Sequence, residues 1–393
     1  MNDVFMNTFH RLPVTFTGGQ GAWLTDVNGK KYLDFTSGIA VNCLGHAYPP
    51  LVAAIAQQAA KINHTCNYYL NDTVSAFAQK LVAACSGAGM KKVFLANSGA
   101  EANEGACKIA RKYSHDKYGK GRHTIVTLRG SFHGRTITTL SATGQDVFHK
   151  NFGPFTEGFV YVPANDIEAL DKALDPNTTA GFMVEAIQGE SGIRPLSAEY
   201  LAAAAGFCAQ RDILLMFDEI QTGIGRTGTF LACEGCGITP DVVTLAKGIA
   251  GGVPAGAVLA GEKAADVLQV GDHGSTFGGN PLAAAAGLVV LDTVAQPGFL
   301  KEITRKGEKI TSALASWNHP NITGIRGKGL MIGVDLTVEA WPLLEAAIAR
   351  AQSGGNPGLL LLTAGKQTLR ILPPYIISDE EIEKGLDALK SIL

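Results

Sequence analysis

Ile213-Leu-Leu-Met-Phe217 is a short apolar run that is followed directly by Asp218. A run of this length without polar alternation predicts a strand that is buried on both faces. A second, largely apolar run, Asp241-Val-Val-Thr-Leu-Ala246, leads in the same way to Lys247. The sequence therefore predicts an acid and a lysine at the ends of two buried strands.

Helical patterns and short apolar runs alternate along the chain from about residue 50 onward. The predicted strands are 93–95, 124–128, 181–184, 213–217 and 242–245, and the predicted helices are 51–60, 73–85, 100–113, 167–174 and 198–211. Such alternation favours an α/β fold with a mainly parallel sheet that helices cover on both faces. Ligands of these sheets bind at the carboxyl ends of the strands, and Ser98, Glu185 and Asp218 all follow predicted strands closely.

The two ends of the chain show other patterns. Residues 13–35 contain two short alternating runs joined by Asn28-Gly29, which predicts a hairpin with a type I′ turn. A helical pattern at 281–296 stops near Pro297, so we expect a boundary at about 290–300 and a smaller α/β domain beyond it. The glycine-rich stretch 354–358 is expected to be a loop.

Composition excludes several classes of protein. The 393 residues carry a net charge of −2 with no block of like charges, which argues against a nucleic-acid or anionic-membrane partner. The N-terminus lacks a signal-peptide pattern, and apolar stretches such as 249–260 are too short to span a bilayer. Seven scattered cysteines suggest no disulfide framework, and the Cys233/Cys236 pair lacks the context of a zinc or redox site. We therefore expect a cytoplasmic protein.

Asp218, Gln221 and Lys247 suit the chemistry of pyridoxal phosphate. A lysine can hold the aldehyde of this cofactor as a Schiff base. An acid can keep the pyridine nitrogen protonated, so that the ring withdraws electrons. These residues are therefore the first candidates for a cofactor site.

Asn97-Ser-Gly-Ala-Glu101 lies between a predicted strand and a predicted helix. Backbone N–H groups and a hydroxyl at such a helix start can bind an anion, and the cofactor phosphate would fit. The alternative is an ordinary helix start, with Ser98 as the N-cap and Glu101 completing a capping box. The two roles are compatible.

Phe132-His-Gly-Arg135 follows the predicted strand 124–128. Phe132 could stack on a flat cofactor, and Arg135 could bind a carboxylate through two hydrogen bonds. A core phenylalanine beside a surface arginine is the alternative. His133 is expected to be structural or to contact the ring, because Lys247 already supplies a base.

Two acids and an arginine complete the candidates. Glu185 and Glu190 follow a predicted strand, but no cluster of metal ligands accompanies them, so no metal is expected. Arg370 lies in an apolar strand, and since a buried arginine is costly unless paired, it should meet a carboxylate of the protein or of a substrate. The polar loop 273–281 could offer a hydroxyl to a phosphate.

Gly223-Ile-Gly-Arg-Thr-Gly228 matches a dinucleotide-binding pattern, which requires a helix opening at that turn. The residues after it do not read as a helix, so we expect these glycines to shape a loop beside the site. A nicotinamide-dependent oxidoreductase is the alternative that rests on this match. A non-catalytic cofactor-binding protein is a further alternative.

Taken in order, these motifs resemble the class III (fold-type I) pyridoxal phosphate-dependent aminotransferases, and most of all their acetylornithine aminotransferase branch. The resemblance covers nearly the whole chain, and its segments are 38–42, 44–46, 97–104, 132–136, 187–190, 218–228, 245–252, 273–281 and the strand around Arg370. It implies a large domain at 46–290 with a seven-stranded sheet. It also implies a small domain built from 1–45 and 291–393.

The resemblance implies a role for each candidate residue. Lys247 and Asp218 would be catalytic, since Lys247 would carry the cofactor and move the proton while Asp218 pairs with the pyridinium nitrogen. The implied cofactor-binding residues are Ser98, Gly99, Ala100, Phe132, Asp218, Ile220, Gln221, Lys247 and Thr276, the last from the second subunit of a homodimer. The implied substrate-binding residues are Arg135, Glu190, Ser275 and Arg370. Glu190 and Arg370 would pair when the amine donor binds and separate when glutamate needs Arg370.

The activity implied by the resemblance is transfer of the δ-amino group of N2-acetylornithine to 2-oxoglutarate in arginine biosynthesis. Family members that act on free ornithine place a tyrosine near the position of Gly38 and Ile39. Its absence from this chain favours an acylated donor. Ornithine, N-succinylornithine and 4-aminobutyrate stay open as donors, because the catalytic residues would act on all of them alike.

Overall fold

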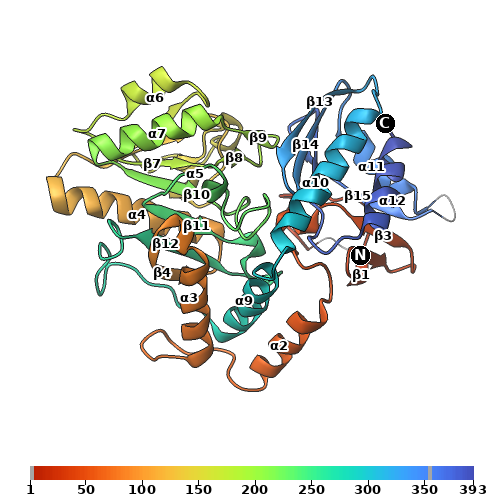
Figure 1. The fold of residues 1–393 in the computed structure, drawn as a ribbon, viewed down its shortest axis with the longest axis horizontal. Helices are drawn as coiled ribbons and strands as arrows, with labels where there is room; N and C mark the ends of the chain where they lie inside the picture. Colours follow the sequence, from red (N-terminus) through yellow and green to blue (C-terminus); the bar gives the residue numbers. More distant parts are fainter. Residues whose placement is uncertain (1–3, 353–355) are drawn as a thin grey trace.

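The computed structural model describes residues 4–352 and 356–393, which form two lobes lying side by side (Figure 1). The larger lobe is built on a seven-stranded sheet with the order β4-β12-β11-β10-β7-β5-β6. Its strands are β4 (Met90–Ala96), β5 (Thr124–Leu128), β6 (Phe159–Val162), β7 (Thr179–Val184), β10 (Leu214–Asp218), β11 (Val242–Leu245) and β12 (Gly256–Gly261). Only β12 runs antiparallel to its neighbours, so the predicted α/β fold with a mainly parallel sheet is confirmed.

Helices cover both faces of this sheet. They are α3 (Asp72–Ala84), α4 (Gly99–Tyr118), α5 (Ile137–Ala142), α6 (Ile167–Ala173), α7 (Ala198–Arg211) and α9 (Pro281–Val294). The central strand β10 alternates between the two faces, as a strand with a side-chain period of two must. Leu214 and Met216 pack in one cluster with alanines of α4, and Leu215 and Phe217 belong to the core on the opposite face.

The smaller lobe joins the two ends of the chain. One sheet has the order β1-β2-β3-β15 and the other the order β13-β14-β17-β16. The strands are β1 (Phe16–Gln20), β2 (Trp23–Asp26), β3 (Lys31–Asp34), β13 (Ile322–Lys328), β14 (Met331–Leu336), β15 (Gly358–Leu360), β16 (Leu362–Ala364) and β17 (Thr368–Ile371). The helices are α10 (Phe299–Ser316), α11 (Trp341–Ala349) and α12 (Asp379–Lys390). Because β15 pairs in parallel with β3, the N-terminal segment is part of this lobe.

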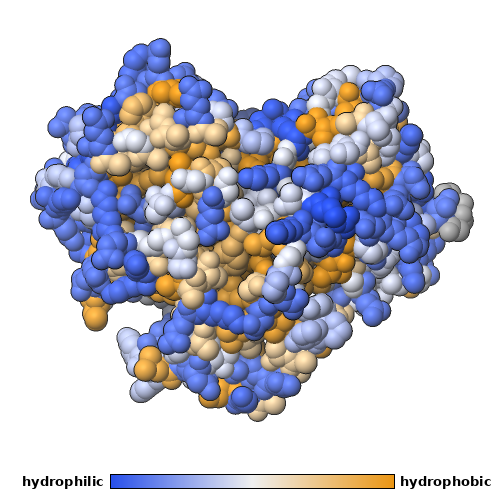
Figure 2. Space-filling view, in the orientation of Figure 1, coloured by the Kyte–Doolittle hydropathy of each residue, from blue (hydrophilic) through white to orange (hydrophobic). Residues whose placement is uncertain are grey.

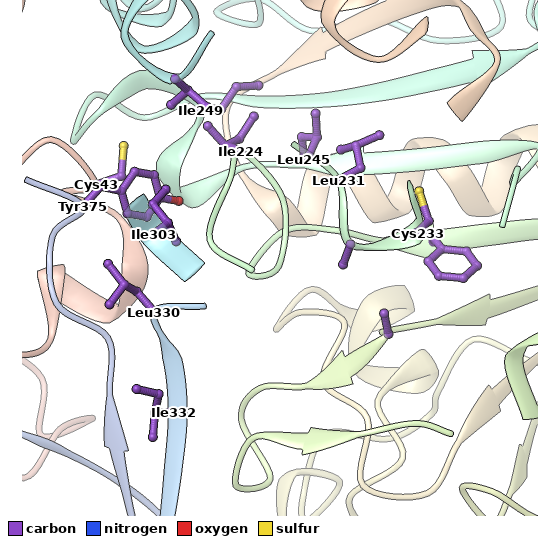
Figure 3. Close-up of a cluster of buried hydrophobic side chains, with 14 of the residues drawn as sticks. Cys43, Ile224, Leu231, Cys233, Leu245, Ile249, Ile303, Leu330, Ile332 and Tyr375 are labelled. Carbon is purple, nitrogen blue, oxygen red and sulfur yellow. The ribbon is translucent and has the colours of Figure 1, made fainter. Parts of the chain in front are cut away.

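Short elements connect the lobes and the sheet edges. They are α1 (Ser37–Ala40), α2 (Pro49–Ala59), α8 (Ala232–Gly235), the pair β8 (Ile187–Gln188) and β9 (Arg194–Pro195), and the 3₁₀ turns η1 (Ser86–Ala88), η2 (Asp146–Phe148) and η3 (Lys247–Ala250). Figure 3 shows Cys43, Ile303 and Tyr375 gathered where segments of both lobes meet. The backbone N–H of Tyr375 donates to the carbonyl of Cys43 at 2.7 Å. The main hydrophobic core is therefore continuous between the lobes.

Several sequence predictions need correction. The strands β6 and β12 were not predicted, because one is short and the other, Gly-Ala-Val-Leu-Ala-Gly, is made of small residues. The predicted hairpin forms between β2 and β3, but only Gly29 of the Asn-Gly pair has a positive φ, so the turn is not type I′. The carboxylate of Asp26 organises the turn by accepting the N–H groups of Asn28 and Lys30, each at 2.9 Å.

The other differences are small shifts in where the predicted helices and strands begin and end. The strand predicted at 213–217 is Leu214–Asp218, and the helix predicted at 100–113 runs on to Tyr118. Of the loop predicted at 354–358, residues 354 and 355 lie outside the described residues, and Gly358 begins β15. No single described helix has the length and apolar character of a membrane span, and only α9 and α10, bent by 75°, meet that criterion as a pair.

We predict that Gly307→Ala destabilises the protein. Gly307 lies inside α10, and a Cβ there would overlap the backbone carbonyl of Gly329, which cannot move as a side chain could. Overpacking of this kind costs about 1–3 kcal/mol, and urea unfolding would measure it. Gly206→Ala in α7 is the matched control, because its Cβ would meet nothing within 4 Å and should stabilise by about 0.5–1 kcal/mol. Equal effects of the two substitutions would contradict this packing.

Candidate active site

A cavity of about 420 Å³ opens at the carboxyl ends of the parallel strands. Ten of the predicted site residues line it, namely Ser98, Gly99, Ala100, Phe132, Arg135, Glu190, Asp218, Ile220, Gln221 and Lys247. The sheet brings these residues together because β4, β7, β10 and β11 all end at this edge. Ser275, Thr276 and Arg370 are not part of the cavity wall.

Asp218 is the most highly connected group of the cavity. Its Oδ2 accepts a hydrogen bond from Nδ2 of Asn103 at 2.7 Å and lies 2.8 Å from Nδ1 of His133. Its Oδ1 accepts the backbone N–H of Ile220 at 3.0 Å. Asn103 is itself oriented by the hydroxyl of Thr244, which donates to its Oδ1 at 2.7 Å. A buried carboxylate needs hydrogen-bond donors of this kind in place of the water it has lost.

His133 therefore has a role that the sequence did not define. Burial lowers the pKa of His133, but the hydrogen bond to Asp218 and the nearby negative charges more than offset this, and the pKa is raised. His133 lines the cavity, and its ring is held against Asp218 through Nδ1. Asn103 was not predicted at all, because a single asparagine within a helix has no local signal.

Glu185 ties two loops of the site together. Its carboxylate accepts the N–H of Phe132 at 3.0 Å and the N–H of Gly189 at 3.3 Å. Complete burial raises the pKa of Glu185 to about 7, although the charge of His133 opposes the rise. The backbone of Phe132 is thus anchored to the loop that carries Glu190.

Lys247 is the second residue after β11, following Ala246, and begins η3. Its φ of 45° lies in the left-handed region, which is costly for a residue with a side chain. Burial lowers the pKa of its amine, while the charges of Asp218 and Glu185 oppose this. A lowered pKa leaves more of the amine unprotonated and therefore nucleophilic.

The N-terminus of α4 forms the anion-binding end of the cavity. Ser98 is the N-cap, and its hydroxyl accepts the N–H of Glu101 at 3.2 Å, as predicted. The carboxylate of Glu101 reaches past the cap to the N–H of Asn97 at 2.6 Å, so the predicted capping box is not formed with Ser98 itself. The N–H groups of Gly99 and Ala100 precede the first intrahelical donor, Ala102, and the helix dipole favours an anion there.

These residues fit pyridoxal phosphate. An anion site, a carboxylate and an amine share one cavity with the aromatic ring of Phe132. Two polar atoms near the wall, Oε1 of Gln221 and Nε2 of His133, are buried without a hydrogen-bond partner in the described ranges. A Cβ on Gly99 would lie 2.7 Å from Ile220, so this backbone is packed closely against a wall residue. Buried polar atoms left unpaired by the protein are where a ligand supplies partners.

Three of the predicted substrate-binding residues, Arg135, Glu190 and Arg370, contact different neighbours, and no hydrogen bond or ion pair joins any two of them in the part of the chain that the structure describes. The guanidinium of Arg135 lies over the ring of Phe148 at 4.0 Å, and Glu190 accepts a hydrogen bond from Nε2 of Gln145 at 2.8 Å. Neither Gln145 nor Phe148 was predicted, since nothing in their local sequence marks a site. Arg370 is buried in β17 and donates to backbone carbonyls, to Thr363 at 3.2 Å and to Gly189 at 3.5 Å. Within the described ranges it forms no ion pair with a carboxylate.

Ser275 and Thr276 lie in a second hollow together with Asn67 and Tyr68. Ser275 is joined to the cavity through Asn97, whose Nδ2 donates to its hydroxyl at 3.1 Å. Thr276 is exposed. These two residues therefore flank the cavity and do not close it within one chain.

The structure also shows what becomes of the glycine pattern at 223–228 and of the cysteines. The segment 223–228 is a loop, and the next helix, α8, begins only at Ala232, so no helix opens on the glycine pattern. All seven cysteines are free thiols. Residues 4–352 and 356–393 contain no group of three or more histidine, cysteine, aspartate or glutamate side chains that could hold a metal ion.

We predict that Thr244→Val lowers the free energy of unfolding by about 1–3 kcal/mol, because Oδ1 of Asn103 would stay buried without its donor. Urea unfolding would measure the loss. Thr127→Val is the matched control, since Thr127 is also buried on a central strand but its hydroxyl has no hydrogen-bond partner in the described ranges. That change should be neutral or stabilise by up to about 1 kcal/mol. Similar losses from both substitutions would remove the support for an oriented Asn103.

Comparison with known proteins agrees with this geometry. The family described as Aminotransferase class-III matches residues 5–393. The acetylornithine aminotransferase of Haemophilus ducreyi is 48% identical over 388 residues, which cover 98% of this chain and 95% of that protein. The solved ornithine aminotransferase of Toxoplasma gondii ME49 has a TM-score of 0.92 and 34% identity, covering 99% of this chain and 92% of its own. The N-acetylornithine aminotransferase of Stenotrophomonas maltophilia K279a has a TM-score of 0.84 and 37% identity, covering 98% and 96%. Because the family match extends over almost all residues, this chain belongs to the class-III aminotransferases.

Proposed function

We propose that the protein transfers the δ-amino group of N2-acetylornithine to 2-oxoglutarate, giving N-acetylglutamate 5-semialdehyde and glutamate. The observation that carries the proposal is the meeting of Lys247, Asp218 and the N-terminus of α4 at one cavity. Similarity to the acetylornithine aminotransferase of Haemophilus ducreyi supports the choice of donor.

Each residue of the cavity would have a distinct task. When bound, pyridoxal phosphate supplies an aldehyde that carries the amino group and a protonated ring that withdraws electrons. Lys247 would hold the cofactor covalently and, once released, move the proton at the substrate carbon. Asp218, held in place by Asn103 and His133, would pair with the protonated ring nitrogen. The N–H groups of Gly99 and Ala100 would bind the phosphate together with Ser98.

The remaining residues would recognise and hold the ligands. Phe132 and Ile220 would cover the ring, and Gln221 would bind its hydroxyl side. Arg135 would hold a substrate carboxylate. Glu190 and Arg370 would act as a switch that pairs for the amine donor and opens for the α-carboxylate of glutamate. The buried position of Arg370 near Gly189, without an ion pair to a carboxylate in the described ranges, supports the second state.

The donor is the finer part of the proposal. Free ornithine is the second candidate, since the Toxoplasma gondii ornithine aminotransferase has the higher TM-score of the two solved structures compared, 0.92 against 0.84. Two observations favour the acetylated donor. The Haemophilus ducreyi relative is the more similar in sequence, and the segment Ser37-Gly-Ile-Ala40 carries no tyrosine that could meet a free α-ammonium.

We also propose a homodimer in which Thr276 of one copy helps to bind the phosphate in the other, with Ser275 near the substrate. Large exposed apolar side chains lie near these residues, namely Tyr68 and Val270 in the same hollow and Phe277 next in the sequence. Figure 2 shows further apolar surface across the lower middle of the molecule, in the region of α9. A second copy covering this surface would remove it from water.

The proposal also includes a division of the chain into domains and a cellular location. The domain division is 1–45 with 291–393 for the small domain and 46–290 for the large one, and the pairing of β3 with β15 supports it. A cytoplasmic place in arginine biosynthesis follows from the donor and acceptor.

We predict that borohydride reduction of the protein reconstituted with pyridoxal phosphate attaches the cofactor to the peptide containing Lys247. Lys247→Ala should abolish this label and lower transamination by several orders of magnitude. Peptide mass spectrometry would locate the label. Lys306→Met is the control, because burial also lowers the pKa of Lys306, which lies on α10 and not in the cavity wall. Labelling that persists in Lys247→Ala would sink the proposal.

We predict that kcat/KM for N2-acetylornithine exceeds that for ornithine by about tenfold or more, since an unpartnered ammonium group is costly to bury. Steady-state rates with 2-oxoglutarate as the acceptor would test this. A preference for ornithine would assign the chain to the second candidate and leave the cofactor chemistry intact.

A further inference from the structure

Gln145 is held in a defined place at the end of β5. The preceding residue, Gly144, bridges to Arg129 in parallel register, and a Cβ on Gly144 would overlap the carbonyl oxygen of Leu128. The N–H of Gly144 also donates to the hydroxyl of the buried Ser131 at 3.1 Å. Only glycine permits so close an approach, so the segment that carries Gln145 is fixed against the strand end.

The side-chain amide of Gln145 has a single sensible orientation. It lies 3.1 Å from the carbonyl oxygen of Ser131 and 2.8 Å from Oε2 of Glu190. Both of these atoms accept hydrogen bonds, so the NH₂ group must face them and can donate one proton to each. Gln145 is also the only donor to the carboxylate of Glu190 in the described ranges.

Arg370 is the cation with which Glu190 would otherwise pair. Burial lowers the pKa of Arg370, and the negative charge of Glu190 opposes this lowering. The two side chains nevertheless form no ion pair, and Arg370 donates to the carbonyls of Thr363 and Gly189 instead. Glu190 is held by Gln145, and Arg370 is bound only to carbonyls among the described residues. The two side chains are therefore separated.

We propose that Gln145 is a positioning residue that holds Glu190 away from Arg370 and so leaves Arg370 free for a dicarboxylate substrate. The inference rests on the proposed function and adds to it the group that competes with Arg370 for Glu190. A hydrogen bond from a neutral amide to a carboxylate is shorter and stronger than one between two neutral groups, because the acceptor is charged. In the structure Glu190 accepts this bond while Arg370 donates to carbonyls.

The same segment also contacts the other carboxylate-binding candidate. Phe148, three residues beyond Gln145, lies beneath the guanidinium of Arg135 at 4.0 Å and meets the ring of Phe132 edge-on at 5.9 Å. Residues 145–148 thus touch both Glu190 and Arg135. The segment does not line the cavity itself, but it lies directly behind two residues that do, Glu190 and Arg135.

The test uses holoenzyme carrying Gln145→Leu, Glu190→Ala or both, with glutarate as a dicarboxylate that cannot react. Without its amide donor, Glu190 turns to Arg370, so Gln145→Leu should weaken glutarate binding about tenfold. It should raise KM for glutamate to a similar extent while kcat changes little. Titration calorimetry and single-turnover spectra would give the two readouts.

The double variant decides between positioning and mere structural support. In the Glu190→Ala background the carboxylate that would compete with glutarate for Arg370 is absent. Adding Gln145→Leu should therefore leave glutarate affinity unchanged. A tenfold loss in both backgrounds, or in neither, overturns the proposal. Gln145→Met, which also removes the donor, should reproduce Gln145→Leu if the leucine variant folds poorly.

Gln188→Leu is the matched control, because Gln188 is a buried glutamine that donates to the carbonyl of Arg129 at 3.0 Å but has no bond to Glu190. It should not change glutarate affinity. A wild-type enzyme that binds glutarate but transfers no amino group would count against the proposed function alone. If it transfers amino groups but the variants show no dependence on Glu190, only the role of Gln145 fails.

Discussion

The burial of one carboxylate, Asp218, constrains much of the larger lobe. Asp218 ends the central strand β10 and is almost completely removed from water. Its oxygen atoms lie within hydrogen-bonding distance of Asn103, His133 and the N–H of Ile220, which replace the water that burial removes. These donors come from a helix, a loop and the next turn of the chain. The packing of α4 on the sheet therefore also places the Asn103 donor against Asp218.

The topology of the sheet explains why the chemical groups converge. In a parallel arrangement every strand ends at the same edge, so loops distant in sequence meet there. Lys247 adds a second constraint, because its left-handed backbone is held by the turn η3 that follows β11. Such strain persists only when the surrounding structure determines it. The reactive amine is thus held in position by the fold around it.

The smaller lobe completes the substrate side. Arg226 is fully buried and donates to the carbonyls of Leu330 and Pro373, with its guanidinium 4.5 Å from the centre of the Tyr375 ring. These contacts join the glycine loop of the larger lobe to the β13–β14 turn and to the segment after β17 in the smaller one. The strand that bears Arg370 is held against the loop of Gly189 by the same packing. Arg370, the candidate for binding a second carboxylate, is therefore positioned by the contacts between the two lobes.

The sequence by itself determined the α/β class, most of the strands and helices of the large sheet, and ten of the residues that line the cavity. This was possible because strand ends and helix starts are local patterns, and Asp218, Lys247 and Ser98 stand at such points. The strand β12, the partners of Asp218 and the contact of Gln145 with Glu190 were decided by the tertiary structure alone. They depend on hydrogen bonds between residues dozens of positions apart, and no local composition records them. The separation of Glu190 from Arg370 belongs to the same group, because competing partners for one charge become visible only when the chain is folded.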